Sequence, residues 1–199
     1  MATTTGDTDV ATAGSSKFGW LMLSVLRIGL GFVFLWAFLD KLIGLGFATC
    51  RKVAEDGSFT ISTMCFNPET GSGAWLKGGH VTEGYLVYGG NPNSPFHDFF
   101  VNLGADRWTD WPFMIGLLGV GLALMLGIGT RIGAWAGVAM LLFMYMTQMW
   151  PANNPILDSH IAYIIAIFAV VWLEFSRQTI GLGSWWRKLP IVKKNPWLV

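Results

Sequence analysis

Six ionisable residues lie within or beside long apolar stretches of the chain, where a charge costs free energy unless it has a partner or a purpose. They are Arg27, Asp40 and Lys41 near the start, and Asp158, His160 and Glu174 near the end. A guanidinium and a carboxylate form a strong ion pair, whereas a histidine titrates near neutral pH and can carry protons. These residue types predict a buried ion pair and a polar cluster that contains a titratable group.

The spacing of these residues predicts which of them meet. Arg27 and Lys41 are 14 positions apart, as are His160 and Glu174, so each pair lies within about 40° of one line along a helix. Antiparallel packing would place Arg27 level with Glu174 at one end. It would also place Lys41 or Asp40 level with His160 at the other end. We expect the first pair to lock two helices together.

Two interpretations of the second group remain open. In one, Asp40 and Lys41 lie among lipid headgroups and Asp158 caps the helix that follows it. In the other, the group is a functional site, because His160 lies in the second turn of a membrane helix and follows the polar residues 153–155. We expect no metal site, because His80, His97 and His160 are few and scattered, and the sequence contains no CxxCH haem motif and no HExxH.

Long apolar segments must position these side chains. Hydrophobic residues make up 53% of the chain and charged residues 13%, against about 25% charged residues in a soluble domain. About 20 apolar residues cross a bilayer, and the segments that qualify are residues 20–47, 111–128, 132–150 and 156–175. The sequence therefore predicts an all-α membrane protein, a bundle of four transmembrane helices in one domain (17–186). We expect a disordered tail (1–16) before this domain and a basic tail (187–199) after it.

The basic residues predict how the helices are oriented, because Lys and Arg near membrane ends favour the cytosolic side. The C-terminal end carries Arg177, Arg187, Lys188, Lys193 and Lys194, whereas the connection 151–155 has no basic residue. We expect a multi-pass protein of the cell membrane with both termini cytoplasmic and the long extracytoplasmic loop, 48–110, outside. The lipid bilayer is the partner that this prediction implies. A net charge of +1 argues against a nucleic-acid partner.

The long loop contains both cysteines, Cys50 and Cys65. The turn signal at Asp56–Gly57 and the alternation that follows it predict a short hairpin between them. A structural disulfide fits this arrangement outside the cell, and a redox-active dithiol is the alternative. Further along, apolar residues spaced at i, i+3, i+4 and i+7 predict a short helix over 96–103, which either lies on the membrane surface or covers the mouth of the bundle.

Four motifs resemble the DoxX/DoxD-like membrane proteins. They are LRIGLG (26–31) leading to DKL (40–42), GLALMLGIGTR (121–131), PANNPILDSH (151–160) and GLGSWW (181–186). The family is similar to the DoxD subunit of thiosulfate:quinone oxidoreductase. The resemblance implies a quinone cofactor and site residues at Arg27, Lys41, Asp158 and His160.

Two functions follow from the resemblance. In the first, the chain is an integral membrane subunit of a quinone-linked oxidoreductase, in which Lys41 with Arg51 or Arg107 holds thiosulfate at the outer face and His160 passes protons. Because no electron carrier is recognisable, the quinone or another redox subunit would supply one. In the second, the chain is a non-catalytic membrane anchor or accessory subunit of a redox complex. Many relatives have a Glu where this chain has Leu117, which favours the second function.

Overall fold

The structure is a computed structural model that describes residues 6–54, 56–152, 154–174 and 177–198, with side chains from residue 17 onward. It is mostly helical. The first helix, α1 (Gly6–Ile43), begins eleven residues before Lys17, so residues 6–16 are helical where the sequence predicted a disordered tail. Once an apolar segment has formed a helix, each added residue gains one backbone hydrogen bond, which favours such an extension. Residues 1–5 of the predicted tail lie outside the described residues.

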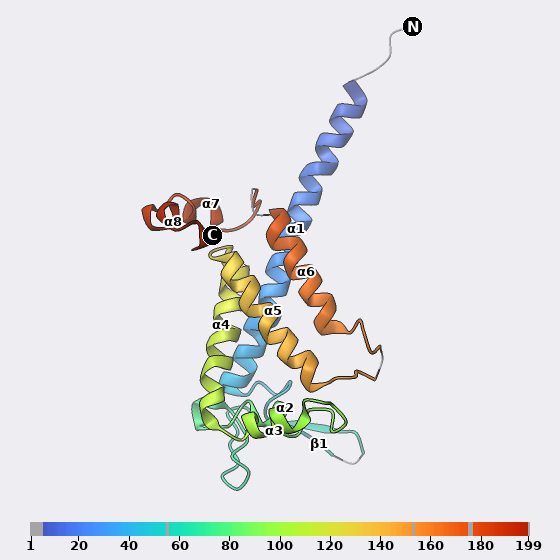
Figure 1. The fold of residues 1–199 in the computed structure, drawn as a ribbon, viewed down its shortest axis with the longest axis vertical. Coiled ribbons are helices and arrows are strands. Elements are labelled where there is room, and N and C mark those ends of the chain that lie inside the picture. The colour runs from blue at the N-terminus through green and yellow to red at the C-terminus, as the bar shows by residue number, and fades with distance from the viewer. Residues whose placement is uncertain (1–5, 55, 153, 175–176, 199) are drawn as a thin grey trace.

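Three further long helices follow, and all four correspond to the predicted apolar segments. They are α4 (Asp110–Leu126), α5 (Thr130–Thr147) and α6 (Ser159–Glu174). Helix α1 packs against α4 and α6, and α5 packs against the same two helices, so the four form a closed ring (Figure 1). Two of the helical segments, Lys17–Ile43 and Arg107–Leu126, are long and apolar enough to cross a membrane.

Glycines allow α1 and α4 to approach closely. A Cβ atom at Gly31 would lie 2.7 Å from the backbone nitrogen of Met125, and one at Gly121 would lie 2.9 Å from that of Leu35. Such contacts are possible only without side chains, as in other helix pairs that bury small residues. The core of the ring is apolar, with Leu30, Phe34, Leu117, Val120 and Ile167 among its buried side chains.

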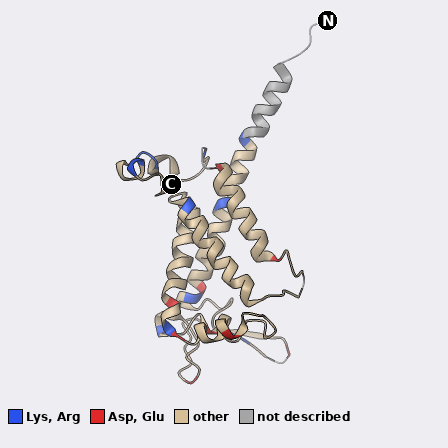
Figure 2. Cartoon of the chain, viewed as in Figure 1, with Lys and Arg blue, Asp and Glu red and all other residues tan. Residues whose placement is uncertain are grey.

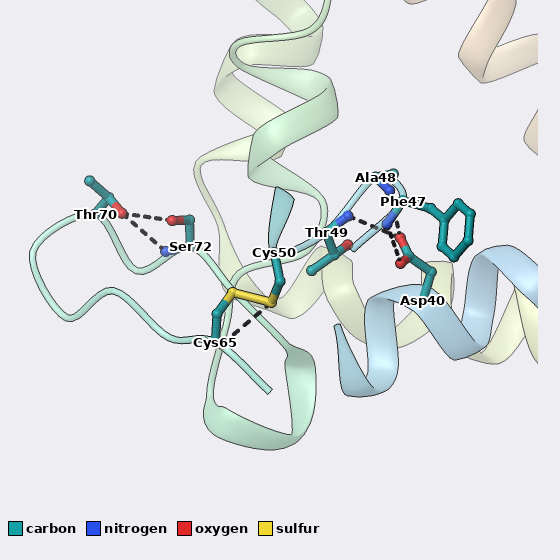
Figure 3. Close-up of a disulfide and its surroundings, with 8 residues drawn as sticks. All are labelled: Asp40, Phe47, Ala48, Thr49, Cys50, Cys65, Thr70 and Ser72. Carbon is teal, nitrogen blue, oxygen red and sulfur yellow. Dashed lines mark hydrogen bonds between the residues drawn. A yellow bond between two sulfur atoms is a disulfide. The ribbon is translucent and has the colours of Figure 1, made fainter. Parts of the chain in front are cut away.

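The segment between α1 and α4 begins with the predicted hairpin. Strand β1 (Arg51–Val53) pairs antiparallel with β2 (Phe59–Ile61), and both strands are exposed. Cys50 and Cys65 lie at disulfide distance, with their Cα atoms 5.6 Å apart, which confirms the predicted pairing (Figure 3).

Short helices complete both ends of the ring. The segment between α1 and α4, which we call the outer segment, contains η1 (Trp75–Lys77), α2 (Glu83–Leu86), α3 (His97–Gly104) and η2 (Arg107–Thr109). The C-terminal segment contains α7 (Gly183–Trp186), α8 (Pro190–Lys194) and η3 (Pro196–Leu198). Helix α3 confirms the short helix predicted over 96–103. Its Phe100 is buried and makes an edge-on ring contact with Phe143 of α5, 6.2 Å between centroids, so α3 lies over the bundle.

The start of α1 and the short helices α7 and α8 lie at the same end of the long helices, and the segment between α1 and α4 lies at the other end (Figure 1). The Lys, Arg, Asp and Glu residues gather toward these two ends (Figure 2). We call the end with β1, β2, α2 and α3 the outer end, and the opposite end the inner end.

The disulfide predicts a stability effect. Replacing both Cys50 and Cys65 with Ser reopens a loop of 15 residues, which should lower the free energy of unfolding by about 3 kcal/mol in the chain-entropy model. Thermal unfolding monitored by tryptophan fluorescence would detect this loss. The exposed Ser58→Ala substitution in the same hairpin is the control. An unchanged midpoint, together with lost redox activity, would contradict a structural role and favour the redox-active alternative.

Candidate functional site

The inner end contains the ion pair that the spacing predicted. Arg27 Nε lies 2.7 Å from Glu174 Oε2, and each side chain is only 1% exposed. The Nη1 group donates to the backbone carbonyl oxygens of Leu124 and Met125, and the Nη2 group donates to that of Ile180. The pair therefore joins α1 to α6, to the end of α4 and to the segment that follows α6.

A serine completes the inner network. Ser24 Oγ donates to Glu174 Oε1 and accepts the backbone N–H groups of Thr179 and Ile180. These hydrogen bonds satisfy the polar atoms that the ring buries here, which is how proteins retain charge in an apolar interior. Because the guanidinium and carboxylate bond to the protein itself, this network supports a structural role for Arg27, which the family resemblance had placed among the site residues.

The predicted meeting of Lys41 or Asp40 with His160 is wrong. Asp40 is buried and accepts the backbone N–H groups of residues 47–49, so it caps the chain that leaves α1 (Figure 3). The Lys41 ammonium lies over the ring of Phe113, 5.8 Å from its centroid. Within the described part of the chain, no hydrogen bond or ion pair joins either residue to His160.

The angle between α1 and α6 explains why Lys41 and Asp40 do not meet His160. Helices α1 and α6 lie close together at the inner end, where Arg27 meets Glu174, and diverge toward the outer end (Figure 1). Equal spacing along two helices brings both ends level only if the helices are nearly antiparallel over their whole length. Here only the inner pair meets.

His160 instead pairs with Asp158, which lies two positions before it. His160 Nδ1 lies 2.5 Å from Asp158 Oδ2, and Asp158 Oδ1 accepts the N–H of Ile161 at 3.0 Å. Asp158 therefore caps α6 and positions His160 at once. Burial raises the pKa of the Asp158 carboxyl, but the hydrogen bonds from His160 and Ile161 outweigh burial and keep this pKa below its ordinary value. The pair lines an open groove of about 520 Å³ that also touches Tyr85 and Gln148.

An apolar chamber of about 390 Å³ lies beside this groove. Helices α2 and α3 form one side of it and α4 and α5 the other, with lining residues that include Leu86, Phe100, Trp108, Phe113, Met140 and Phe143. Tyr85 lines both the chamber and the groove, and its hydroxyl donates to the carbonyl oxygen of Met144 at 3.1 Å. Burial raises the pKa of Tyr85 above its ordinary value. A largely apolar chamber with a few polar groups is typical of small-molecule sites.

The polar groups of the apolar chamber include Thr82 and Thr109, which belong to a second histidine–aspartate cluster. His80 Nδ1 lies 3.0 Å from Asp110 Oδ1, and both side chains are 5% exposed. Asp110 also accepts the N–H of Thr82 at 2.9 Å and its hydroxyl at 2.8 Å. His80 Nε2 is buried with no hydrogen-bond partner among the described residues.

Sequence reasoning did not select His80 or Asp110. The two are 30 positions apart, one in an irregular segment and the other in the first turn of α4, so no helical periodicity relates them. The available signal was Asp110 itself, an acidic residue at the border of an apolar helix that required a partner.

His80 also lines a polar chamber of about 660 Å³ in the outer segment. Its lining includes the Cys50–Cys65 disulfide, Arg51 and Lys52, with Glu83 as an acidic member. Arg107 is outside this lining and donates to the carbonyl oxygen of Gly78 at 2.9 Å. Among the described residues, no group of three or more His, Cys, Asp and Glu side chains could hold a metal ion.

The inner ion pair predicts the effect of one substitution. Glu174→Gln removes the negative charge and leaves Arg27 buried beside a neutral amide, which should lower the free energy of unfolding by about 3 kcal/mol. Thermal unfolding in detergent measures the loss. Glu69→Gln, on an exposed loop, is the matched control. Equal melting of Glu174→Gln and the parent protein would show that the pair is not structural.

Comparisons with known proteins add no relative. No family model matches the chain, and neither a curated protein nor a solved structure matches it. The function must therefore be argued from the chambers and the polar groups that line them.

Proposed function

We propose that α1, α4, α5 and α6 all cross a lipid bilayer. Large apolar side chains point outward from each of these helices, whereas Arg27 and Glu174 are buried between them. A soluble protein has the opposite distribution, with apolar side chains inside and charged ones outside. An apolar outer surface as extensive as this one needs lipid or a partner to cover it. The outward side chains include Phe32, Val33, Trp111, Ile115, Trp135, Leu142, Ile165 and Leu173. With 16 residues, α6 is the shortest of the four helices and is just below the roughly 17 residues that a span usually needs.

In this arrangement the protein is a multi-pass protein of the cell membrane. The inner end, with both termini and the basic C-terminal residues, faces the cytosol, because Lys and Arg near membrane ends favour that side. The outer segment, with its cysteine pair and both chambers, faces outward, where disulfides persist.

Within the membrane the protein is a quinone-linked oxidoreductase subunit of DoxX/DoxD type. The observation that carries this proposal is the apolar chamber of about 390 Å³, which adjoins two histidine–aspartate pairs. A quinone ring is flat and apolar with polar oxygen atoms, so it suits aromatic and methionine side chains with a few hydroxyl groups. Tyr85, Thr82 and Thr109 are the hydroxyl residues of the lining. Their hydroxyls donate within the protein, to the carbonyl oxygen of Met144, to Asp110 and to the carbonyl oxygen of Asp106, so a quinone oxygen would have to draw one of them away.

The reduced substrate is a small sulfur anion such as thiosulfate, bound in the polar chamber. Arg51 and Lys52 line that chamber and supply the positive charge that an anion requires, and neither Lys41 nor Arg107 lies in its lining. Two thiosulfate ions lose one electron each and join through a new S–S bond to form tetrathionate. The quinone takes up these two electrons and two protons to become quinol. Electrons pass directly or through a partner redox subunit.

A non-catalytic anchor or accessory subunit is the second candidate, and Leu117 favours it. This residue occupies the position where many relatives have a glutamate, and it is buried in the apolar core. Asp110 is an argument against the anchor function. It lies seven positions before Leu117 on α4, within about 20° of the same helix face, and provides a buried carboxylate there.

The proposal predicts that the purified protein binds a short-chain quinone. Decylubiquinone should quench the fluorescence of Trp108, which lines the apolar chamber, in a saturable way, and Trp108→Phe should remove that part of the signal. Filling the chamber with Met140→Trp should weaken binding at least about tenfold. Leu122→Trp, on an exposed face of α4, is the matched control. If the wild-type protein binds no quinone, the anchor function replaces this proposal.

A second experiment tests His160. His160→Ala should fold normally, because the imidazole is partly exposed and its protein partner is the helix-capping Asp158. Thiosulfate-driven reduction of decylubiquinone should fall about 100-fold, the usual contribution of one proton-transfer group. His97→Ala, in α3, is the control and should keep the parent rate. Full activity of His160→Ala would place the proton-transfer site elsewhere.

A further inference from the structure

The C-terminal segment, residues 177–198, folds as a compact unit at the inner end. Trp186 Nε1 of α7 donates to the carbonyl oxygen of Leu198 at 2.8 Å, which joins α7 to η3. Val192 of α8 is only 2% exposed. Pro190 begins α8, where its fixed φ angle suits the first turn of a helix. The segment therefore presents a defined surface.

This unit is fixed to the helices of the ring. The Leu182 N–H donates to the carbonyl oxygen of Leu126 at 2.8 Å, and Gln178 Nε2 donates to that of Gly127 at 3.1 Å. The short helix η3 packs against α5. The segment is thereby held level with the turn between α4 and α5, and Figure 1 shows it extending sideways from there instead of continuing along α6.

Three large apolar side chains of the segment are exposed. Trp185, Ile191 and Trp197 each expose more than half of their surface. Two of them are tryptophans, whose rings combine an apolar body with an N–H donor and concentrate where a membrane meets water. The contacts that hold the segment together use Trp186 and Val192, so the three exposed side chains are available to a partner outside the chain.

The same segment is strongly basic. Residues 175–199 contain five basic residues and no acidic one. Lys188, Lys193 and Lys194 are exposed, and Figure 2 shows basic residues on this part of the chain. A lysine can lay its hydrocarbon stem along an apolar surface and keep its ammonium group in a polar layer. Exposed aromatic rings together with an excess of positive charge are typical of segments that lie in the plane of an anionic membrane surface.

We propose that the C-terminal segment lies in the inner headgroup layer of the bilayer and binds anionic phospholipids through Lys188, Lys193 and Lys194. This inference rests on the proposed membrane arrangement and is independent of the quinone. The ammonium groups meet the lipid phosphates, while the exposed tryptophans and Ile191 enter the boundary with the acyl chains. Each lysine near an anionic surface adds about fivefold to the affinity.

A lipid surface accounts for the position of the segment as well as for its charge. An acidic protein could also pair with the lysines. It would give no reason for the segment to extend sideways at the level where α4 and α5 end, which is where spanning helices leave the hydrocarbon core. Lipid headgroups lie at that level on every side of the ring.

The first test measures lipid selectivity by native mass spectrometry of the full-length protein in a non-ionic detergent. The parent protein should bind phosphatidylglycerol, which is anionic, at least about tenfold more tightly than zwitterionic phosphatidylcholine. The double substitution Lys193→Gln and Lys194→Gln should remove at least about tenfold of the phosphatidylglycerol affinity and leave that for phosphatidylcholine unchanged. Lys52→Gln with Lys77→Gln removes the same charge from exposed positions at the outer end and should keep the parent affinities.

The second test measures depth in nanodiscs of mixed phosphatidylcholine and phosphatidylglycerol. A nitroxide label on Ile191→Cys can be attached selectively, because Cys50 and Cys65 are joined to each other. Its collisions with oxygen and with a water-soluble nickel complex report depth, and the label should lie below the lipid phosphates. The same label on Asn93→Cys, exposed in the outer segment, is the control and should lie in water.

Each outcome gives a definite answer. If alkaline extraction releases the protein from membranes, the membrane arrangement fails and this inference fails with it. If the protein stays in the membrane, three results each overturn the lipid site alone: no preference for phosphatidylglycerol in the parent, an unchanged preference in the Lys193 and Lys194 variant, or a water-exposed label at position 191. A label at membrane depth, together with the loss of affinity in that variant but not in the outer-end control, supports the inference.

Discussion

The buried pair of Arg27 and Glu174 is the constraint on which the arrangement of the long helices depends. A guanidinium in apolar surroundings must have an anion and must use its remaining donors. Arg27 meets both needs by bonding to α6 through Glu174, to the end of α4 through Leu124, and to the chain beyond α6 through Ile180. Three segments are therefore held at one point, and the helices can separate only away from it.

The separation at the outer end creates the space in which the candidate site lies. Helices α4 and α5 are joined by the short turn at residues 127–129 at the inner end and diverge toward the outer end, where α2 and α3 lie across them (Figure 1). Side chains of these four helices leave the apolar chamber between them. The outer segment is therefore part of the site, because it encloses the chamber and contributes His80, Thr82 and Thr109.

The sequence predicted the features that depend on local composition or on the cost of burial. Apolar length located the long helices, and the cost of a buried charge paired Arg27 with Glu174. The prediction that Lys41 meets His160 was wrong, because the packing of two helices sets the angle between them, and a 14-residue spacing does not encode that packing. Sequence reasoning also missed His80, because residues in irregular segments carry no periodic signal and meet their partners only through the tertiary fold.

The depth of the buried carboxylate on α4 bears on the proposed function, because Leu117 stands where a glutamate was expected. Asp110 lies seven residues closer to the outer end than Leu117, which is about 10 Å along α4. A carboxylate near the middle of the bundle would need a further path to water, whereas Asp110 bonds directly to a histidine that lines the outer polar chamber. Under the proposed function, an acid at this depth lies closer to the outer surface than one at position 117, so Leu117 can serve as core packing while Asp110 supplies a carboxylate on that face of α4.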